Sequence, residues 1–587
     1  MFSHITKLLN AQPTTIEPKK TKFCLPITYL NSKNLYKITD IVSNDLELVS
    51  NTDLNNENLP MYEHLLQPTN ILGKQNIPLW NEYFTNDVPF LLDTQNIIKN
   101  LDTYNNEMKL LQKPNYDNII ETWDEVKNDE YFLEKYNYMD WDMLKHLNNS
   151  SKFLQIISII HLLSPIVSLI IPIILLIIPF ILLKIQGVQL SISTYFDTLK
   201  FLGKNHFIGK MLSTGELTGQ NILYVFMMLG FYVFQVYQNI TICLRFYSNI
   251  NKINSQLIEF KNYIDYSIHS METFLNTTNQ NHTYIPFCED IKIHCNHLYN
   301  LKNHIQSITT YTKFQKINNI GYLLKCYYLL FSNNDFENGI NYSMKFEGYI
   351  DNLNSIYQHY NNSSISFANY NNDNDISFKK QYYPALVKEK HVKNDCILNK
   401  NMIISAPNKA GKTTILKSTA INIIFSQQFG CGFYESANIM PFTHIHSYIN
   451  IPDTSGRDSL FQAESRRCKD IIDIISENNE NHNHFCIFDE LYSGTNPVEA
   501  AQAGTAFLQY LQQFNNVKFI LTTHYLSICK KYKNSKCIQN YKMDVHINAD
   551  ESFSYKYKLK KGISKIKGGI RVLKDLNYPD EIIKNIK

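Results

Sequence analysis

Hydrophobic positions are strongly segregated along this chain of 587 residues. Residues 153–183 include no Asp, Glu, Lys or Arg, and a second uncharged stretch covers residues 217–244. About 20 apolar residues suffice for a helix to cross a bilayer. The pattern therefore predicts a transmembrane helical hairpin within residues 151–245.

A pair of buried helices in a large soluble core is the alternative to this hairpin. Pro165, Pro172 and Pro179 lie seven residues apart in the first stretch, and membrane helices tolerate proline better than soluble ones do. The numbers of Lys and Arg around the hairpin do not decide its orientation. Two spans leave both flanking regions on one side. We therefore expect a membrane-associated protein.

The polar pattern beyond the hairpin predicts the remaining segments. From Phe246 to about Leu353, apolar residues recur at helical spacing among polar ones, which predicts long amphipathic helices or a coiled pair. The Asn-rich stretch 361–375 is typical of a loop or domain boundary. After it, short apolar runs alternate with helical stretches, as in an α/β domain.

The expected fold is an α/β domain at the C-terminus, preceded by a mostly α-helical region with a transmembrane hairpin. The expected segments are an acidic and mostly helical N-terminal region at 1–150, the hairpin at 151–245, a helical connector at 246–375, and the α/β domain at 376–587.

Charge is segregated as strongly as hydrophobicity, although the formal net charge is only +3. Residues 1–150 hold 13 Lys, no Arg and 21 acidic residues, a net charge of −8. Residues 526–587 hold 15 basic and 6 acidic residues, a net charge of +9. Lys and Arg supply much of the affinity for a DNA backbone, so the N-terminal region is a poor surface for nucleic acid.

A phosphate-binding loop is predicted between the apolar run Met402–Ser405 and a helix expected at Ile415–Gln428. The loop reads Ala406-Pro407-Asn408-Lys409-Ala410-Gly411-Lys412-Thr413-Thr414. This is the spacing G-x-x-x-x-G-K-[ST], with Ala406 in place of the first Gly. Backbone N–H groups from Asn408 to Thr413 would hold phosphates at the helix N-terminus. Lys412 would reach the β- and γ-phosphates, and the Thr413 hydroxyl would ligate Mg²⁺.

Two further apolar runs end in polar residues that suit ATP hydrolysis. The run His484–Phe488 ends in Asp489, which would hold Mg²⁺, and Glu490, which would orient or deprotonate the attacking water. The run Val517–Leu521 is followed by His524, which would sense the γ-phosphate. Three such motifs in order predict a nucleotide site.

The same motifs resemble those of the ATPase domain of the MutS mismatch-repair family. The loop resembles that family's GPNMGGKST, residues 455–464 resemble its S-G-R-S-T-F-x-x-E with Asp458 inserted, residues 488–495 resemble M-D-E-x-G-R-G-T, and Thr523-His524-Tyr525 matches T-H-Y. The resemblance covers residues 381–587, about a third of the chain.

This resemblance implies that residues 376–587 form an α/β P-loop ATPase domain of the ABC type, which uses ATP and Mg²⁺ and works as a homodimer with composite ATP sites. It also implies that the connector resembles part of that family's lever. An ATP site would place both flanks of the hairpin on the cytosolic side, so we expect the ATPase domain to face the cytosol. Each site would take Lys412, Thr413 and Asp489 from one subunit and Ser459 from the other. Glu490 and His524 would be the catalytic pair. Ala406 and the inserted Asp458 depart from the family pattern, so we expect slow turnover.

The resemblance also implies binding of mismatched double-stranded DNA and a role in DNA mismatch repair. The sequence does not show which residues would read DNA: Phe132-Leu133-Glu134 has the letters of the family's Phe-x-Glu motif, but we interpret it as a chance match in an acidic helical stretch. The alternative is a membrane-anchored MutS-like ATPase that acts on the lipid bilayer or on a protein partner. An ABC transporter subunit fits less well, because no L-S-G-G-Q is present and two spans are too few for a pore.

Overall fold

The computed structural model divides the chain into two compact units. Unit 1 comprises Met1–Gln112, His269–Cys295 and Asn341–Lys587, and unit 2 comprises Lys113–Ile268 and Asn296–Ile340. The structure describes residues 22–51, 59–187, 191–202, 219–371, 376–387, 391–449, 451, 459–477, 482–548, 552–566, 578–579 and 581–582. The four-segment division expected from the sequence stays a prediction.

The first part of unit 1 is mostly helical, as expected. Its elements are η1 (Pro26–Tyr29), η2 (Ser32–Asn34), β1 (Leu35–Lys37), α2 (Asp40–Asp45), α3 (Met61–Leu66), α4 (Ile71–Trp80), β2 (Tyr83–Thr85), α5 (Val88–Lys99) and α6 (Leu101–Met108). Polar residues begin several of these helices. Thr39 accepts a hydrogen bond from the Val42 N–H, and Asp87 accepts one from the Phe90 N–H. Both satisfy helix-end donors that have no partner within the helix.

A six-stranded sheet forms the core of the C-terminal part of unit 1, which confirms the α/β prediction. Its strands are β6 (Asn401–Ser405), β9 (His444–Tyr448), β10 (His484–Asp489), β11 (Val517–Thr523), β12 (Ile538–Ile547) and β13 (Phe553–Lys561). Their order is β13-β12-β6-β11-β10-β9, and every neighbouring pair is parallel except β12–β13. Parallel strands are covered on both faces, which explains their continuous apolar runs.

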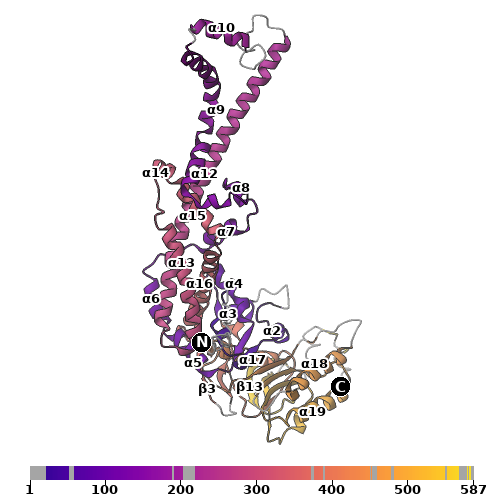
Figure 1. Ribbon diagram of the computed structural model, residues 1–587. Coiled ribbons are helices and arrows are strands. Elements are labelled where there is room, and N and C mark those ends of the chain that lie inside the picture. The colour runs from indigo at the N-terminus through magenta and orange to yellow at the C-terminus, as the bar shows by residue number, and fades with distance from the viewer. Residues whose placement is uncertain are drawn as a thin grey trace, which may run out of the picture. The chain divides into compact units, whose positions relative to one another are not determined.

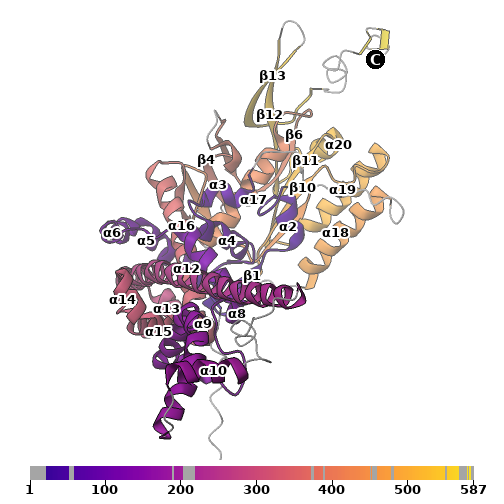
Figure 2. The ribbon, with the colours of Figure 1, turned by 90° about the horizontal axis from the view of Figure 1, so that it is seen from above.

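Helices cover both faces of this sheet. They are α17 (Lys412–Phe429), α18 (Leu460–Glu477), α19 (Pro497–Leu511) and α20 (Leu526–Lys531). Ile471 of α18 and Leu508 of α19 share a buried cluster with Phe488 and Phe519 of the central strands. Figure 2 shows α18 and α19 together beside β10 and β11, with α17 on the other side of these strands.

The first part of unit 1 packs against α17. The Gln428 side chain donates hydrogen bonds to the carbonyls of Trp80 (2.6 Å) and Tyr83 (2.7 Å). The neighbouring Gln427 donates to the carbonyl of Thr85 at 2.9 Å. Both glutamine side chains are buried, so the N-terminal elements and the P-loop helix share one core.

A second, five-stranded sheet lies in the same unit. Its strands are β3 (Ser366–Tyr370), β4 (Ser377–Gln381), β5 (Asn394–Ile397), β7 (Cys431–Gly432) and β8 (Ser436–Ile439), with η6 (Pro384–Leu386) between β4 and β5. The strand order is β5-β4-β8-β3-β7. Gln95 of α5 donates to the carbonyls of Ala368 and Gly430 at 2.8 and 2.9 Å, which ties the N-terminal helices to this sheet as well.

Unit 2 consists mainly of helices. They are α7 (Tyr116–Asn128), α8 (Phe132–Lys135), η3 (Lys145–Asn149), α9 (Ser151–Ile185), α10 (Ile192–Leu202), α14 (Lys313–Asn318) and α15 (Ile320–Ser332). Three longer helices have residues in both units, namely α12 (Gly219–Thr277), α13 (Ile285–Ile305) and α16 (Asn334–Asn361), and η5 (His282–Tyr284) belongs to unit 1. Long helices over residues 246–353 are thus confirmed.

Helix α12 joins two segments that we expected to be separate, namely the second apolar stretch and the helical connector. The second apolar stretch was expected to end near residue 245, where the connector begins. In the structure α12 runs from Gly219 to Thr277 without a break. Charged residues enter at Arg245, but the backbone continues as a helix, because a change in side-chain polarity does not interrupt its hydrogen bonding.

Helices α9 and α12 lie side by side and antiparallel in unit 2 (Figure 1). The Tyr232 hydroxyl donates to the Ser168 carbonyl at 3.2 Å, and the Cys243 thiol lies 3.6 Å from the Leu162 carbonyl oxygen. Both helices are long and apolar enough to cross a membrane, by length and composition. The three prolines of α9 lie within its helical span.

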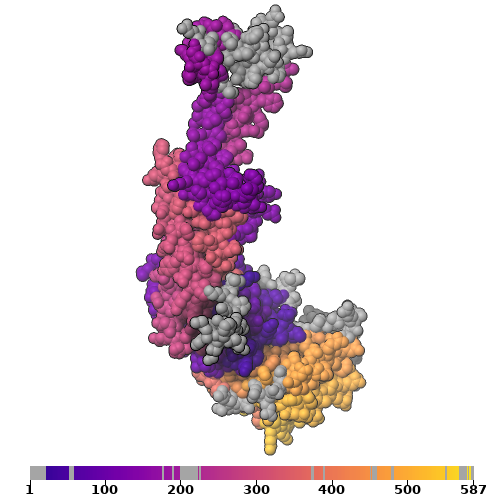
Figure 3. Space-filling model, in the orientation of Figure 1, coloured from indigo at the N-terminus to yellow at the C-terminus, as the bar shows by residue number. Residues whose placement is uncertain are grey.

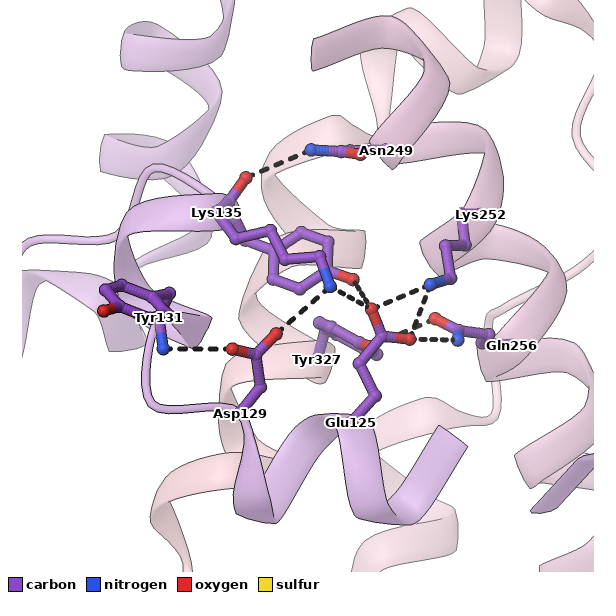
Figure 4. A network of polar contacts seen from close by, with 9 residues as sticks. Glu125, Asp129, Tyr131, Lys135, Asn249, Lys252, Gln256 and Tyr327 are labelled. Atoms are coloured by element: carbon purple, nitrogen blue, oxygen red, sulfur yellow. Dashed lines mark hydrogen bonds and ion pairs between the residues drawn. The ribbon is translucent and has the colours of Figure 1, made fainter. Parts of the chain in front are cut away.

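A charged network ties α7 to the part of α12 that follows its apolar stretch (Figure 4). Glu125 accepts hydrogen bonds from Lys135 (2.6 Å), Lys252 (2.7 Å), Tyr136 (2.6 Å) and Gln256 (3.0 Å). Burial disfavours the ionised carboxylate, but these donors outweigh it and lower the pKa of Glu125 to about 2.

We expect Glu125→Gln to destabilise unit 2, because the neutral amide cannot replace a carboxylate that pairs with two ammonium groups. The loss should be roughly 1–3 kcal/mol at neutral pH. Because the pKa of Glu125 is lowered, its carboxylate stabilises the fold at pH values above the ordinary pKa of 4.5. This stabilisation is lost as the pH falls towards 2.

Unfolding followed by circular dichroism at pH 7 and pH 3 tests this expectation, with the exposed Glu121→Gln on the same helix as control. A difference between wild type and Glu125→Gln that stays constant from pH 7 to pH 3 would contradict it.

Candidate nucleotide-binding site

The predicted phosphate loop connects the end of β6 to the start of α17. Gly411 has φ +87°, the left-handed conformation that glycine adopts without strain. A Cβ at this position would lie 3.1 Å from the Tyr557 ring, so close approach also favours glycine. The helix begins at Lys412, three residues earlier than expected.

Ala406 fits the first glycine position because its backbone does not need glycine. Its φ is not positive, and its side chain is buried. Its carbonyl accepts a hydrogen bond from the Lys412 ammonium at 3.1 Å. The departure from the usual loop motif therefore leaves the loop backbone able to turn into α17.

The N-terminus of α17 suits an anion. Its N-cap, Gly411, has no side chain to accept from the first N–H groups, and no side-chain cap forms there. These donors carry partial positive charge and favour phosphate oxygens. The residues from Asn408 to Thr414 line a cavity of about 640 Å³.

Asp489, at the end of β10, lies between two threonine hydroxyls. Thr413 of α17 donates to one carboxylate oxygen at 2.7 Å, and Thr522 of β11 donates to the other. This contact depends on the parallel pairing of β10 with β11, which sets Asp489 opposite Thr522. A hydroxyl beside a carboxylate forms the hard oxygen donor set that Mg²⁺ prefers, so Thr413 and Asp489 could hold this cation.

Glu490 turns out of the strand and joins Lys412 to His524. Its φ of +54° is a left-handed conformation that a non-glycine residue rarely adopts. The carboxylate accepts from the Lys412 ammonium at 2.7 Å and lies 3.4 Å from the His524 Nδ1. The His524 hydrogen bond and the Lys412 ammonium outweigh desolvation and lower the pKa of Glu490 to about 2.

The structure thus brings together residues from three predicted motifs. Lys412, Thr413, Asp489 and Glu490 line the cavity, and His524 reaches it through Glu490. Ser459 does not line the cavity. Ser459 is exposed, and its hydroxyl oxygen accepts a hydrogen bond from the Gln462 N–H at 3.4 Å. Residues 455–458 of the signature stretch lie outside the described residues.

Sequence reasoning gave no role to Glu464, which also lines the cavity. This buried carboxylate on α18 accepts from the Ser493 N–H (2.9 Å), the Ser493 hydroxyl (2.9 Å) and the Gly494 N–H (3.1 Å). It therefore fixes the loop that follows Glu490. The sequence did offer one indication of this role, because Glu464 is the last residue of the signature motif at 455–464.

Tyr557 of β13 is a second residue that sequence reasoning missed. Its ring lies against Gly411 and lines the cavity. A flat aromatic ring beside a phosphate site offers a stacking surface for a nucleobase. The tail segment that begins at Tyr557 also resembles the family, but sequence reasoning assigned this tyrosine no role at the site, because the hairpin β12–β13 carries it to the loop only through long-range pairing.

Comparison with known proteins agrees with these motifs. Residues 402–587 match the family model "MutS domain V", a domain that belongs to a family of ATPases. The chain is 28% identical over 217 residues to the "DNA mismatch repair protein MutS" of Persephonella marina and 29% identical over 225 residues to that of Bacteroides fragilis. It is also 28% identical over 219 residues to the "Putative endonuclease MutS2" of Bacillus subtilis.

Each match covers 36% of this chain and 24–26% of the relative. The chain therefore spans only about a quarter of the length of the curated relatives it matches. The similarity lies in the part that holds the cavity, its phosphate loop and both carboxylates. The C-terminal region of this chain, residues 402–587, carries a MutS domain V.

Proposed function

We propose that this protein binds ATP with Mg²⁺ in the cavity at the start of α17 and hydrolyses it slowly. The observation that supports the proposal is the convergence of Lys412, Thr413, Asp489 and Glu490 from two strand ends on one cavity. Bound Mg²⁺ would neutralise charge on the phosphates. The loop N–H groups and Lys412 would hold the phosphate oxygens, and the Tyr557 ring would stack on the base.

Glu490 is the base in this proposal. A water oxygen attacks the γ-phosphorus, its proton passes to the Glu490 carboxylate, and the bond from the γ-phosphorus to the β–γ bridging oxygen breaks to leave ADP. In the structure Glu490 is paired with Lys412 and His524, which makes it a weak base. Phosphates that draw Lys412 away would remove one cation and raise the Glu490 pKa towards a useful value.

We expect Glu490→Gln to bind ATP but to lose turnover by roughly 10²–10⁴-fold, the contribution typical of a general base. ATP binding by fluorescence titration and phosphate release by a coupled assay measure the two effects separately. The control is Glu499→Gln, on the first turn of α19. Normal ATP hydrolysis by the Glu490→Gln variant would contradict the assignment of Glu490 as the general base.

We also propose that two copies of the chain form composite ATP sites, each completed by Ser459 of the second copy. This follows from the family resemblance and agrees with the position of Ser459, which is exposed and outside the cavity of its own chain. Such sites would make hydrolysis depend on closure of the dimer.

Mixing two inactive variants tests the composite site. Lys412→Ala and Ser459→Arg should each lose most activity alone, whereas an equimolar mixture should recover up to about half of the activity per mixed dimer, because one of its two sites is intact. ATPase assays on the mixture, with dimer exchange verified by labelled subunits, give the answer. Verified exchange without recovery would contradict the proposal.

Mismatched double-stranded DNA is the partner we propose for this ATPase, because the names of the MutS relatives point to it. We expect the ATPase rate to change when a duplex with one mismatch is added, and we expect binding to weaken as salt rises. Fluorescence anisotropy with matched and mismatched duplexes at two salt concentrations measures this. Equal and negligible binding of both duplexes, with and without ATP, would exclude DNA as the partner while leaving the ATPase proposal intact.

A further inference from the structure

A band of exposed apolar side chains surrounds part of the α9–α12 pair. This apolar band comprises Ile159–Leu183 of α9 and Leu223–Leu244 of α12. Among the band residues whose side chains the structure describes, thirteen large apolar side chains on α9 and eleven on α12 are at least 40% exposed. The most apolar windows of the two helices are only 11% and 0% buried, whereas an apolar core helix of a soluble protein would be mostly buried.

The exposure extends around the helices and is not confined to one stripe. The consecutive residues Leu169, Ile170 and Ile171 are 50%, 41% and 46% exposed. Successive residues point about 100° apart, so these three alone cover about 200° of the helix circumference. A protein partner covers one stripe of a helix, whereas lipid surrounds it. The occupant that fits an all-round apolar surface is the hydrocarbon of a bilayer.

The length of the band fits a bilayer on both helices. About 25 residues of α9 and 22 of α12 rise roughly 38 and 33 Å at 1.5 Å per residue. The hydrocarbon layer is about 30 Å thick, and a modest tilt accommodates the difference. Helices α9 and α12 differ in sequence, but their exposed apolar surfaces are nearly equal in length.

Protein packing in unit 2 ends where the band begins. Leu154 and Ser158 of α9 are buried, as are Phe246 and Ile250 of α12. The His161 ring stacks on Phe246 with centroids 5.7 Å apart, at the edge of the band. Beyond this edge the pair extends towards α10 (Figure 3). The Glu125 network of Figure 4 fixes α12 on the packed side of the same edge.

Helix α10 carries a second apolar surface near the far end of α9 (Figure 1). Tyr195 is buried against the Phe180 ring, with centroids 4.7 Å apart. Ile192 and Phe196 of the same helix are 66% and 48% exposed. Apolar residues exposed on a short amphipathic helix beside a membrane span suit the boundary between head groups and hydrocarbon.

We propose that the apolar band spans a lipid bilayer as a two-helix hairpin, with α10 in the interface at the distal face. Since the hairpin has two spans, the chain before α9 and the chain after residue 244 emerge on the same face. The proposal concerns the surface that covers the band, and it does not depend on ATP hydrolysis or on DNA binding.

Extraction and flotation of the full chain test this proposal. Membranes from expressing cells are washed with 1 M salt and then with alkaline carbonate, and detergent-purified protein is reconstituted into phosphatidylcholine vesicles and floated on a density gradient. We expect more than nine-tenths of the protein to resist both washes and to float with the vesicles. Lys412→Ala should behave identically, so a failed ATPase proposal would not affect this result.

Two double variants test whether the apolar band is the surface that contacts lipid. Ile170→Arg with Phe231→Arg places charge within the band and should reduce the floating fraction more than tenfold. Leu110→Arg with Trp141→Arg, at residues 86% and 67% exposed outside the band, should leave flotation unchanged. Release of the wild type by carbonate would overturn the proposal. A monodisperse soluble oligomer without detergent would also overturn it, because a second copy would then cover the band.

Discussion

Two adjacent carboxylates at the end of β10 set the constraint on which the nucleotide site depends. Asp489 and Glu490 are close enough to repel each other, so the structure must supply donors to both. It separates them by the left-handed turn at Glu490. Two threonine hydroxyls then satisfy Asp489, while an ammonium and an imidazole satisfy Glu490. Each carboxylate takes one donor from the start of α17 and one from the end of β11, so the parallel order β6-β11-β10 is a condition for this charge balance.

The same constraint connects the site to the rest of unit 1. Lys412 and Thr413 can reach the carboxylates only if α17 begins directly at the loop, and α17 is buried along nearly its whole length. Its last turn is fixed by Gln427 and Gln428, whose amides bond to the backbone of the N-terminal elements. These contacts are uncharged hydrogen bonds, so the acidic composition of residues 1–150 does not oppose them. The N-terminal elements are thus structural support for the phosphate loop.

Much of the site could be predicted from the sequence because its signals are local. The strand ends before Ala406, Asp489 and His524 are apolar runs followed by polar residues, and the parallel sheet brings such ends to one edge. Glu464 and Tyr557 could not be assigned in this way, since their roles arise from packing of α18 and β13 against the loop. The apolar stretches were equally visible, but periodicity could not show that α12 continues past residue 245 as one helix. Nor could it show that α4, β2 and α5 pack against α17, because hydrogen bonds such as that between Gln428 and Trp80 join positions 348 residues apart.

That separation has a consequence for how the protein is made. A ribosome adds about 5–20 residues per second, so roughly 20–70 s pass between synthesis of Trp80 and synthesis of Gln428. During this interval the carbonyls of Trp80, Tyr83 and Thr85 lack the partners that they have in the folded unit, and the apolar side chains around them have no α17 to cover them. The apolar stretches of α9 and α12 emerge within the same interval. The elements around Trp80 are therefore synthesised well before α17 but are among the last to complete their core.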